Sequence, residues 1–300
     1  MDTFRDPELT DRQWAAPLLS AEGSMGCEYN YDNVYLWSRP YGQKIARLGD
    51  RLLVQVQGEL GVSYLFPAGQ GDLIPALDAL KEDAAACGAP LTLVCVTEDQ
   101  KTKLEENCPG RFAFEEDRDG WDYIYDVNRL AELAGKKLHA KRNHIHRFDE
   151  QFPDWMFEPI CPDNVAECVD MERAWAAERQ EDPGEESLPE ETVAVIEALY
   201  QTEALALEGG LIRAGGRVVA FSLGSFTTPE CFDVHFEKAY GEIQGAYTVI
   251  NREMARFIRE RHPQVRWFNR EDDLGLEGLR KAKLSYYPDI LLKKYTAREK

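Results

Sequence analysis

The hydrophobic positions in residues 155–300 show two kinds of pattern, which alternate along the chain. Short apolar or alternating runs, typical of β-strands, are separated by stretches with the 3.6-residue repeat of amphipathic helices. The order they predict is β-α-α-β-β-β-α-β-α-β, with a hairpin that turns at Gly215 and Gly216. The clearest helix begins near Gly245, and its apolar face consists of Ala246, Val249, Ile250, Met254, Phe257 and Ile258.

The first half of the chain repeats this order less clearly. The pattern predicts strands at 44–49 and 51–57, a helix over 73–88 and a buried strand at 91–96. One continuous helix over 128–148 is expected to lead into the second half.

Three antiparallel strands followed by alternating helices and strands is the arrangement of GNAT acyltransferases. A doubly wound Rossmann sheet would need βαβ units from its first strand. We therefore expect an α/β (α+β) protein with a tandem GNAT-like fold, in which two mixed sheets are flanked by helices. Residues 1–150 would form a degenerate N-terminal half, and residues 151–300 a C-terminal half that carries the function. A single wide sheet with an N-terminal embellishment is the alternative.

The charge balance narrows the partners. The 300 residues include 35 basic and 54 acidic side chains, a net charge of −19. Such a surface repels nucleic acid and anionic lipid at long range, so either partner would need a local basic patch.

The cysteines and the apolar runs bear on location. The seven cysteines are an odd number without a CxxC pair, which favours a reducing compartment. Neither a signal peptide nor an apolar run near the ~18 residues of a membrane span is found in the sequence. We therefore expect a cytoplasmic protein with no transmembrane segment.

Three blocks of sequence resemble one known family. They are FNREDDLGLEGLRKAKLSYYPDILLKKY (268–295), DYIYDVNRLAELAGKKLHAKRNHIHRF (122–148) and EKAYGEIQGAYTVINREMA (237–255). Their order is similar to an uncharacterised bacterial group related to the C-terminal catalytic domain of phosphatidylglycerol lysyltransferases. The resemblance implies a tandem GNAT-like fold, shared with peptidoglycan aminoacyltransferases.

The implied activity is transfer of an aminoacyl or acyl group to an amine or hydroxyl acceptor, which is a small molecule or a lipid headgroup. The donor substrate would be an aminoacyl-tRNA or a coenzyme A thioester, and no other cofactor is implied. The alternative is a non-catalytic GNAT-like relic that binds a small ligand or a protein partner.

A polar segment follows the strand expected at the centre of the second sheet. Asn269, Arg270, Glu271 and Asp272 come directly after Trp267 and Phe268, at the end of a strand where substrates of this fold lie. Arg270 can clamp a carboxylate or phosphate, and Glu271 or Asp272 can orient an amine or act as a base. We expect substrate binding and catalysis here, with Glu271 as a catalytic residue.

The helix after this segment offers further candidates. Tyr286 matches the position at which the family resemblance implies a proton donor to the leaving group. Lys281 and Lys283 resemble paired lysines that would neutralise a phosphate or a developing oxyanion. The alternatives are packing of the tyrosine beside Pro288 and a solvated helix face for the lysines.

Two other places in the second half carry candidates. Gln244, Gly245 and Ala246 stand where a GNAT fold binds the donor phosphates at a helix N-terminus, although a plain turn would look similar. Glu237 and His235 alternate on one strand and so share a face, which suggests a general base beside a substrate-binding histidine. A wet sheet surface is the alternative.

Two charged stretches complete the predictions. Residues 136–147 carry +5 and include Lys137, Lys141 and Arg142, which makes them the patch best suited to tRNA or another phosphate. A solvated helix paired with acidic neighbours is the alternative. The spacing of the three histidines in this stretch is unsuited to a metal site. The loop 178–191, with seven acids, either attracts an amine-bearing acceptor or is a solvated loop.

Overall fold

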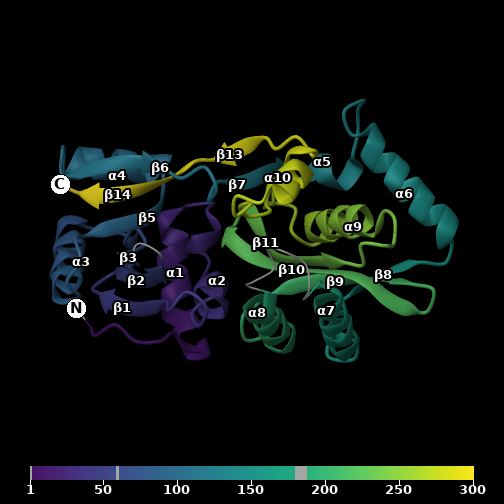
Figure 1. Cartoon of the computed structure of the whole chain (residues 1–300), viewed down its shortest axis with the longest axis horizontal. Coiled ribbons are helices and arrows are strands. Elements are labelled where there is room, and N and C mark those ends of the chain that lie inside the picture. The colour runs from purple at the N-terminus through teal and green to yellow at the C-terminus, as the bar shows by residue number, and fades with distance from the viewer. Residues whose placement is uncertain (1, 59–60, 180–187) are drawn as a thin grey trace. The chain divides into compact units, whose positions relative to one another are not determined.

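The structure is a computed structural model that describes residues 2–58, 61–179 and 188–300. The chain divides into two compact units, Met1–Ile124 with Asn269–Lys300 and Tyr125–Phe268. The first unit thus combines the N-terminal part of the chain with its last 32 residues. Figure 1 shows the elements of both units.

The first unit is built on a mixed sheet of order β1-β2-β3-β5-β14-β6, with β4 paired to β2. Only β3 and β5 pair in parallel among the register pairs of this sheet within the described residues. Its strands are β1 (Lys44–Leu48), β2 (Arg51–Gly58), β3 (Gly61–Tyr64), β4 (Ala68–Gly69), β5 (Thr92–Thr97), β6 (Phe112–Glu116) and β14 (Lys294–Glu299). Its helices are η1 (Leu9–Asp11), α1 (Arg12–Glu22), η2 (Cys27–Tyr29), α2 (Tyr31–Leu36), α3 (Ile74–Ala86), α4 (Glu98–Asn107) and α10 (Glu277–Leu284).

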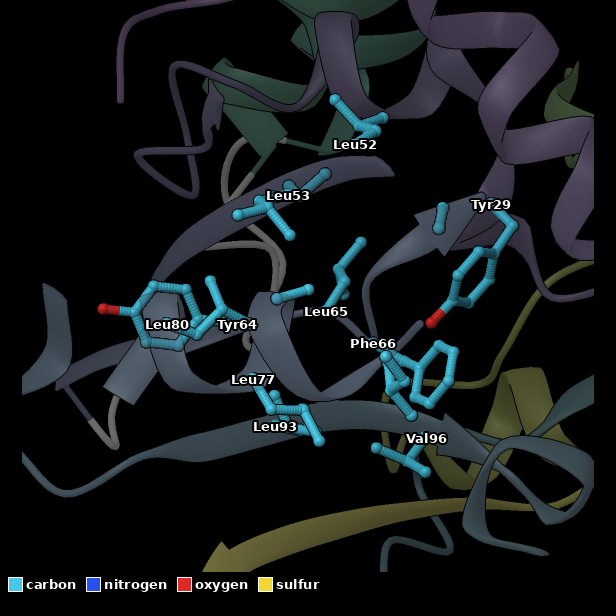
Figure 2. Packing of buried hydrophobic residues seen from close by; sticks show 14 of the residues in the cluster. Tyr29, Leu52, Leu53, Tyr64, Leu65, Phe66, Leu77, Leu80, Leu93 and Val96 are labelled. Carbon is cyan, nitrogen blue, oxygen red and sulfur yellow. The ribbon is translucent and has the colours of Figure 1, made fainter. Parts of the chain in front are cut away.

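Large apolar side chains fill the core of this unit. Leu77 and Leu80 of α3 lie over Tyr64 and Leu93 of the sheet, and all four are buried (Figure 2). Full burial of each leucine contributes roughly 2 kcal/mol of hydrophobic free energy. The aromatic residue Tyr29 belongs to the same core.

The second unit contains a sheet in which β12, β11, β10, β9 and β8 are neighbours in that order. β10 pairs antiparallel with both β9 and β11, and its turn to β9 uses Gly215 and Gly216 as expected. The strands are β8 (Met156–Pro159), β9 (Glu208–Ala214), β10 (Arg217–Thr228), β11 (Cys231–Ala239) and β12 (Trp267–Asn269). The helices are α5 (Val127–Glu132), α6 (His139–Gln151), α7 (Val165–Arg179), α8 (Leu188–Tyr200) and α9 (Ala246–Arg261).

Two predicted elements are each divided in two. The helix expected over 128–148 breaks after α5, because Leu133 adopts a left-handed conformation with φ 50° and ends the first helix. The last predicted strand, DILLKKY, divides into β13 (Ile290–Leu292), which pairs with β7 (Asp122–Asp126), and β14, which runs between β5 and β6. This second division brings Lys294 into the first sheet.

The order of the other elements from β8 to β12 agrees with the order predicted from the sequence. The prediction of an α/β protein with two mixed sheets flanked by helices is confirmed. No helix among residues 2–58, 61–179 and 188–300 combines the length and apolar character that crossing a membrane requires.

Candidate functional site

Asn269 anchors the polar segment that follows β12. Its side chain is completely buried, and its Nδ2 donates hydrogen bonds to the carbonyl oxygen of Met25 and to Asp122 Oδ2, both at 2.8 Å. Its Oδ1 accepts a hydrogen bond from the backbone N–H of Glu271 at 2.7 Å. One amide side chain therefore fixes the start of the segment to two distant parts of the first unit.

Lys294 is the charged centre of this buried region. Its Nζ lies 2.6 Å from Asp122 Oδ1, 2.7 Å from Glu28 Oε1 and 3.5 Å from Cys27 Sγ. Burial by itself would lower the pKa of Lys294, but the negative groups around it, Asp122 first among them, together outweigh burial and raise this pKa well above its ordinary value. The lysine is therefore a permanent cation between two carboxylates.

Three side chains around Lys294 are of types that can bind a metal ion. Ligand atoms of Cys27, Glu28 and Asp122 lie within 4.8 Å of one another. The Lys294 ammonium already contacts all three residues, and burial raises the pKa of the Cys27 thiol well above its ordinary value. A metal ion would need a thiolate and the displacement of this ammonium, so the group fits a lysine cation better than a metal.

Glu271 occupies a strained position directly beside this network. Its φ is 54°, a left-handed conformation that non-glycine residues rarely adopt. Asn269 holds its backbone N–H, and Asn33 Nδ2 donates to its Oε1 at 3.0 Å. Strained backbone held by several contacts is common at functional sites, which supports a role for this side chain.

Asp272 and Lys283 form the next part of the segment. The Lys283 Nζ donates to the carbonyl oxygen of Arg270 at 2.5 Å and to that of Asp272. Burial raises the pKa of Asp272 to about 7, and burial lowers the pKa of Lys283. A carboxyl group that titrates near neutral pH can exchange protons with a substrate.

Asp273 is held in a different way. Burial would raise the pKa of Asp273, but hydrogen bonds from Arg280 and Tyr123 outweigh it and lower this pKa to about 2. Arg280 donates to both of its carboxylate oxygens, at 2.7 and 2.9 Å. This residue therefore stabilises the loop between β12 and α10 as a permanent anion.

The remaining candidates of the α10 region differ in exposure. The Tyr286 ring is buried, and the Arg270 guanidinium lies 5.0 Å from its centroid, within cation–π range. Lys281 is exposed on α10. The first unit thus brings together Asn269, Arg270, Glu271, Asp272, Lys283 and Tyr286.

Glu237 and His235 lie in the second unit on β11. Asn251 Nδ2 of α9 donates to Glu237 Oε2 at 3.1 Å. The His235 ring is buried, with Nε2 2.8 Å from Ser225 Oγ and Nδ1 3.5 Å from Asp233 Oδ2. Asn251 thus holds the Glu237 carboxylate, and Ser225 and Asp233 lie beside the two ring nitrogens of His235.

The turn Gln244–Ala246 begins α9. Gln244 is exposed, Ala246 is buried, and Gly245 has φ 93° at the N-cap. A Cβ on Gly245 would lie 2.4 Å from the carbonyl oxygen of His144 on α6. Close packing against α6 is thus sufficient to require this glycine, whatever it binds.

The predicted basic patch lies at α6 and just before it. Lys137 is exposed, while Lys141 and Arg142 are half-buried. Arg142 Nη1 donates to the carbonyl oxygens of Leu133 and Gly135, at 2.5 and 2.8 Å. The central part of the acidic loop, residues 180–187, lies outside the described residues; at its edge, Glu191 pairs with Lys238 at 2.8 Å.

Reasoning from the sequence missed Cys27, Glu28, Asp122 and Lys294. A lysine and an aspartate within strand-like runs, in DILLKKY and DYIYDV, are weak signals because many such residues face solvent. Cys27 and Glu28 begin the aromatic-rich run CEYNYDNVYLW (27–37) and carry no local signal for a charged site.

Comparisons with known proteins agree with this fold. Residues 22–298 match the family model described as "Phosphatidylglycerol lysyltransferase, C-terminal". A conserved protein of unknown function from Bacteroides thetaiotaomicron is 40% identical, with a TM-score of 0.93 and complete coverage of both chains. The C-terminal domain of an Agrobacterium fabrum protein named as a lysylphosphatidylglycerol synthetase is 16% identical, with a TM-score of 0.67 over 97% of this chain and 92% of that one.

A tandem GNAT protein from the clavulanic acid biosynthesis pathway shares the fold at 12% identity, with a TM-score of 0.50 over 99% of this chain and 98% of that one. An uncharacterised protein of Mycoplasmoides gallisepticum is 26% identical over 182 residues, which are 58% of this chain. The matched part spans about half, 54%, of that curated relative. The predicted tandem GNAT-like fold is confirmed, and the chain belongs to the family of phosphatidylglycerol lysyltransferase C-terminal domains.

Proposed function

We propose that this chain is an acyltransferase that uses the segment Asn269–Asp272 for catalysis. It transfers an aminoacyl or acyl group from a phosphate-bearing donor, an aminoacyl-tRNA or an acyl-coenzyme A, to an amine or hydroxyl acceptor. The observation that supports this most is the strained Glu271 backbone next to Asp272, held by the buried Asn269–Asp122–Lys294 network. Carboxylates held in this way keep their geometry while a substrate reacts.

The reaction requires two proton transfers. An amine acceptor must lose a proton before its nitrogen attacks the acyl carbonyl, and Asp272 accepts that proton while Glu271 orients the amine. The new bond forms between the acceptor and the acyl carbon, and the bond from this carbon to the donor sulfur or ribose oxygen breaks. The Tyr286 hydroxyl donates a proton to that leaving atom.

Basic side chains near the segment bind the carboxylate or phosphate groups of the substrates. Arg270 holds a carboxylate or phosphate, and its position over the Tyr286 ring restricts its rotation. Lys283 fixes the backbone of the segment through the carbonyl oxygens of Arg270 and Asp272. Lys281 lies exposed on the same helix and adds positive charge for the donor.

Glu237 and His235 are a second candidate base and binding residue on β11. The acceptor is a small molecule or a lipid headgroup, and the reaction takes place in the cytoplasm.

A transfer assay tests the proposal. Purified protein is incubated with labelled acyl-coenzyme A or lysyl-tRNA and a panel of amine, hydroxyl and lipid acceptors. Asp272→Asn is expected to lower the transfer rate by about 10²–10⁴-fold, the usual contribution of a general base. Asp99→Asn, on the exposed face of α4, removes the same charge and is expected to leave the rate unchanged.

If the single variants Asp272→Asn, Glu271→Gln and Arg270→Ala all kept full activity, the site assignment would be overturned. A thermal-shift titration with coenzyme A, acetyl-coenzyme A and a non-hydrolysable aminoacyl-adenosine mimic tests the donor class separately. Ligand at a hundred times its Kd should stabilise the fold by about 2.7 kcal/mol. A wild-type protein that responds to no donor and transfers nothing would favour the non-catalytic alternative.

A further inference from the structure

Three arginines line one groove of the second unit. The groove lies beside α5, α6 and α9, has a volume of about 250 Å³, and is lined by Arg142, Arg252 and Arg256 together with Glu132 and Asp149. Such a volume is large enough for a phosphate group with part of the molecule that carries it. The arginines come from two helices, so the groove exists only in the folded unit.

Each guanidinium group is oriented by contacts within the unit. Arg142 Nη1 is bonded to the carbonyl oxygens of Leu133 and Gly135, and Arg256 Nε to that of Ala131 at 2.9 Å. Arg252 Nε and Arg256 Nη1 both donate to Glu253, at 2.6 and 3.0 Å. Holding a guanidinium in place reduces the entropy that it loses when it binds a ligand.

These contacts use only part of each guanidinium. Arg142 Nη2, both Nη atoms of Arg252 and Arg256 Nη2 have no hydrogen bond to the described part of the chain. The bonded nitrogens join Arg142 of α6 to the end of α5 and Arg256 of α9 to α5, and the remaining amino groups can donate hydrogen bonds to a ligand.

The two acids that line the groove have other partners. Glu132 pairs with Arg259 at 3.0 Å, and Asp149 accepts a hydrogen bond from Trp155 Nε1 at 2.7 Å. With Arg259 and Glu253 included, four arginines stand against three carboxylates, and on α6 Lys141 and Arg147 add two positive charges against the one negative charge of Glu150. This local excess of positive charge contrasts with the net charge of −19 of the whole chain.

We propose that this groove binds phosphate groups of the donor substrate. Guanidinium groups bind phosphate oxygens through paired hydrogen bonds, and their charge compensates for that of the phosphate. Both donor classes, aminoacyl-tRNA and acyl-coenzyme A, carry phosphates. The inference rests on the proposed function only in requiring a phosphate-bearing donor.

Direct binding tests this without any transfer reaction. A short fluorescein-labelled RNA is titrated with the full chain and followed by fluorescence anisotropy, with coenzyme A and inorganic pyrophosphate as competitors. Arg252→Gln is expected to weaken binding about tenfold, the loss of one charge-assisted hydrogen bond. If the ligand is RNA, the slope of log K against log salt should also fall by about 0.7 for each phosphate contact removed.

Arg173→Gln is the matched control. This arginine lies on α7 of the same unit, is 62% exposed and pairs weakly with Asp170 at 3.9 Å. Its removal changes the net charge equally and should leave binding within about twofold, as expected for a weakly interacting surface charge. Arg142→Lys, which keeps the charge but not the paired geometry, is a second variant, and the midpoint of thermal unfolding shows whether each variant is folded.

The competitors distinguish the sources of the phosphate. Displacement of RNA by excess unlabelled RNA but not by coenzyme A supports a nucleic-acid donor, and displacement by coenzyme A supports a coenzyme A thioester. Equal binding by wild type, Arg252→Gln and Arg142→Lys, or no binding of any probe by wild type, would overturn the inference. If wild type and both arginine variants bind equally and all transfer normally, only the role of the groove is rejected. If wild type binds the donor through the groove but transfers nothing, the proposed function is rejected instead.

Discussion

The Lys294 ammonium and the Asp122 carboxylate lie 2.6 Å apart, and neither side chain is exposed to solvent. A buried pair of this kind is held by mutual attraction that compensates for the loss of hydration of both charges. Glu28 adds a second carboxylate 2.7 Å from the same ammonium. The three side chains join residues that are as far as 266 positions apart in the sequence.

Lys294→Met should therefore unfold the protein at much lower denaturant concentration. It leaves Asp122 buried without its cation, and breaking such a pair usually costs about 3–5 kcal/mol. The free energy of unfolding in urea measures this loss. Adding Asp122→Asn to Lys294→Met should recover part of it, since the uncompensated charge is then gone.

The adjacent lysine is the control for this substitution. Lys293 is 47% exposed and lies 3.7 Å from Glu116, so Lys293→Met should change stability by less than about 1 kcal/mol. Equal losses for the two variants would contradict a special role of the buried pair.

Glu172 predicts a pH dependence of stability in the second unit. Its side chain is buried on α7, Thr192 Oγ1 donates to its Oε1 at 3.1 Å, and burial raises its pKa from 4.5 to about 7, against the opposing charge of Lys238. The folded state therefore binds this proton more tightly than the unfolded state. The stabilisation is fully present below pH 4.5 and is lost as the pH rises to about 7.

Glu172→Gln should remove this dependence. The difference in unfolding free energy between wild type and variant should shift in favour of the variant by at most about 1.4 kcal/mol per pH unit between about 5 and 7. Urea unfolding at several pH values measures it, and Glu190→Gln, on the exposed start of α8, should parallel wild type. A constant difference across this range would argue against a buried carboxyl that titrates there.

Gly245→Ala should destabilise the second unit by about 3 kcal/mol. The left-handed φ of 93° disfavours any side chain, and the new Cβ would lie 2.4 Å from the His144 carbonyl oxygen. The reference is Gly216→Ala, where φ is 79° and no atom lies within 4 Å of the added Cβ. That variant should lose only about 1 kcal/mol, so thermal unfolding of the two should separate the clash from the conformational cost.

Asp272 should control the pH dependence of transfer. Since burial raises its pKa from 3.8 to about 7, the fraction of the base form grows as the pH rises from 6 to 8. We expect kcat/KM to rise through this range in wild type, and this inflection to be absent in Asp272→Asn. Glu271→Gln should lower the rate but keep the inflection; its loss in that variant instead would assign the base to Glu271.

Much of the fold of residues 155–300 could be predicted locally. The strand and helix order, the hairpin at Gly215–Gly216 and the apolar face of α9 follow from burial periodicity, which neighbouring residues encode by themselves. The polar segment Asn269–Asp272 could also be identified, because together with Asp273 it places five polar residues in a row after Phe268, more than a turn needs. The exact ends were less predictable: the left-handed Leu133 that ends α5 has no distinctive sequence signal.

The buried network could not be predicted in this way. The run DILLKKY is consistent with one strand, and only the tertiary structure divides it so that β13 pairs with β7 while β14 pairs with β5 and β6. That pairing places Lys294 beside Asp122 and Glu28.

The sequence alone determined which segments are strands and helices and which of them end in polar residues, because hydrophobic period and turn residues are local properties. The tertiary structure decided that Cys27, Glu28, Asp122, Asn269 and Lys294 share one buried site and that three arginines of α6 and α9 share one groove. The physical reason is that the partner of a strand or a buried charge is chosen by the packing of distant segments, which no local pattern records.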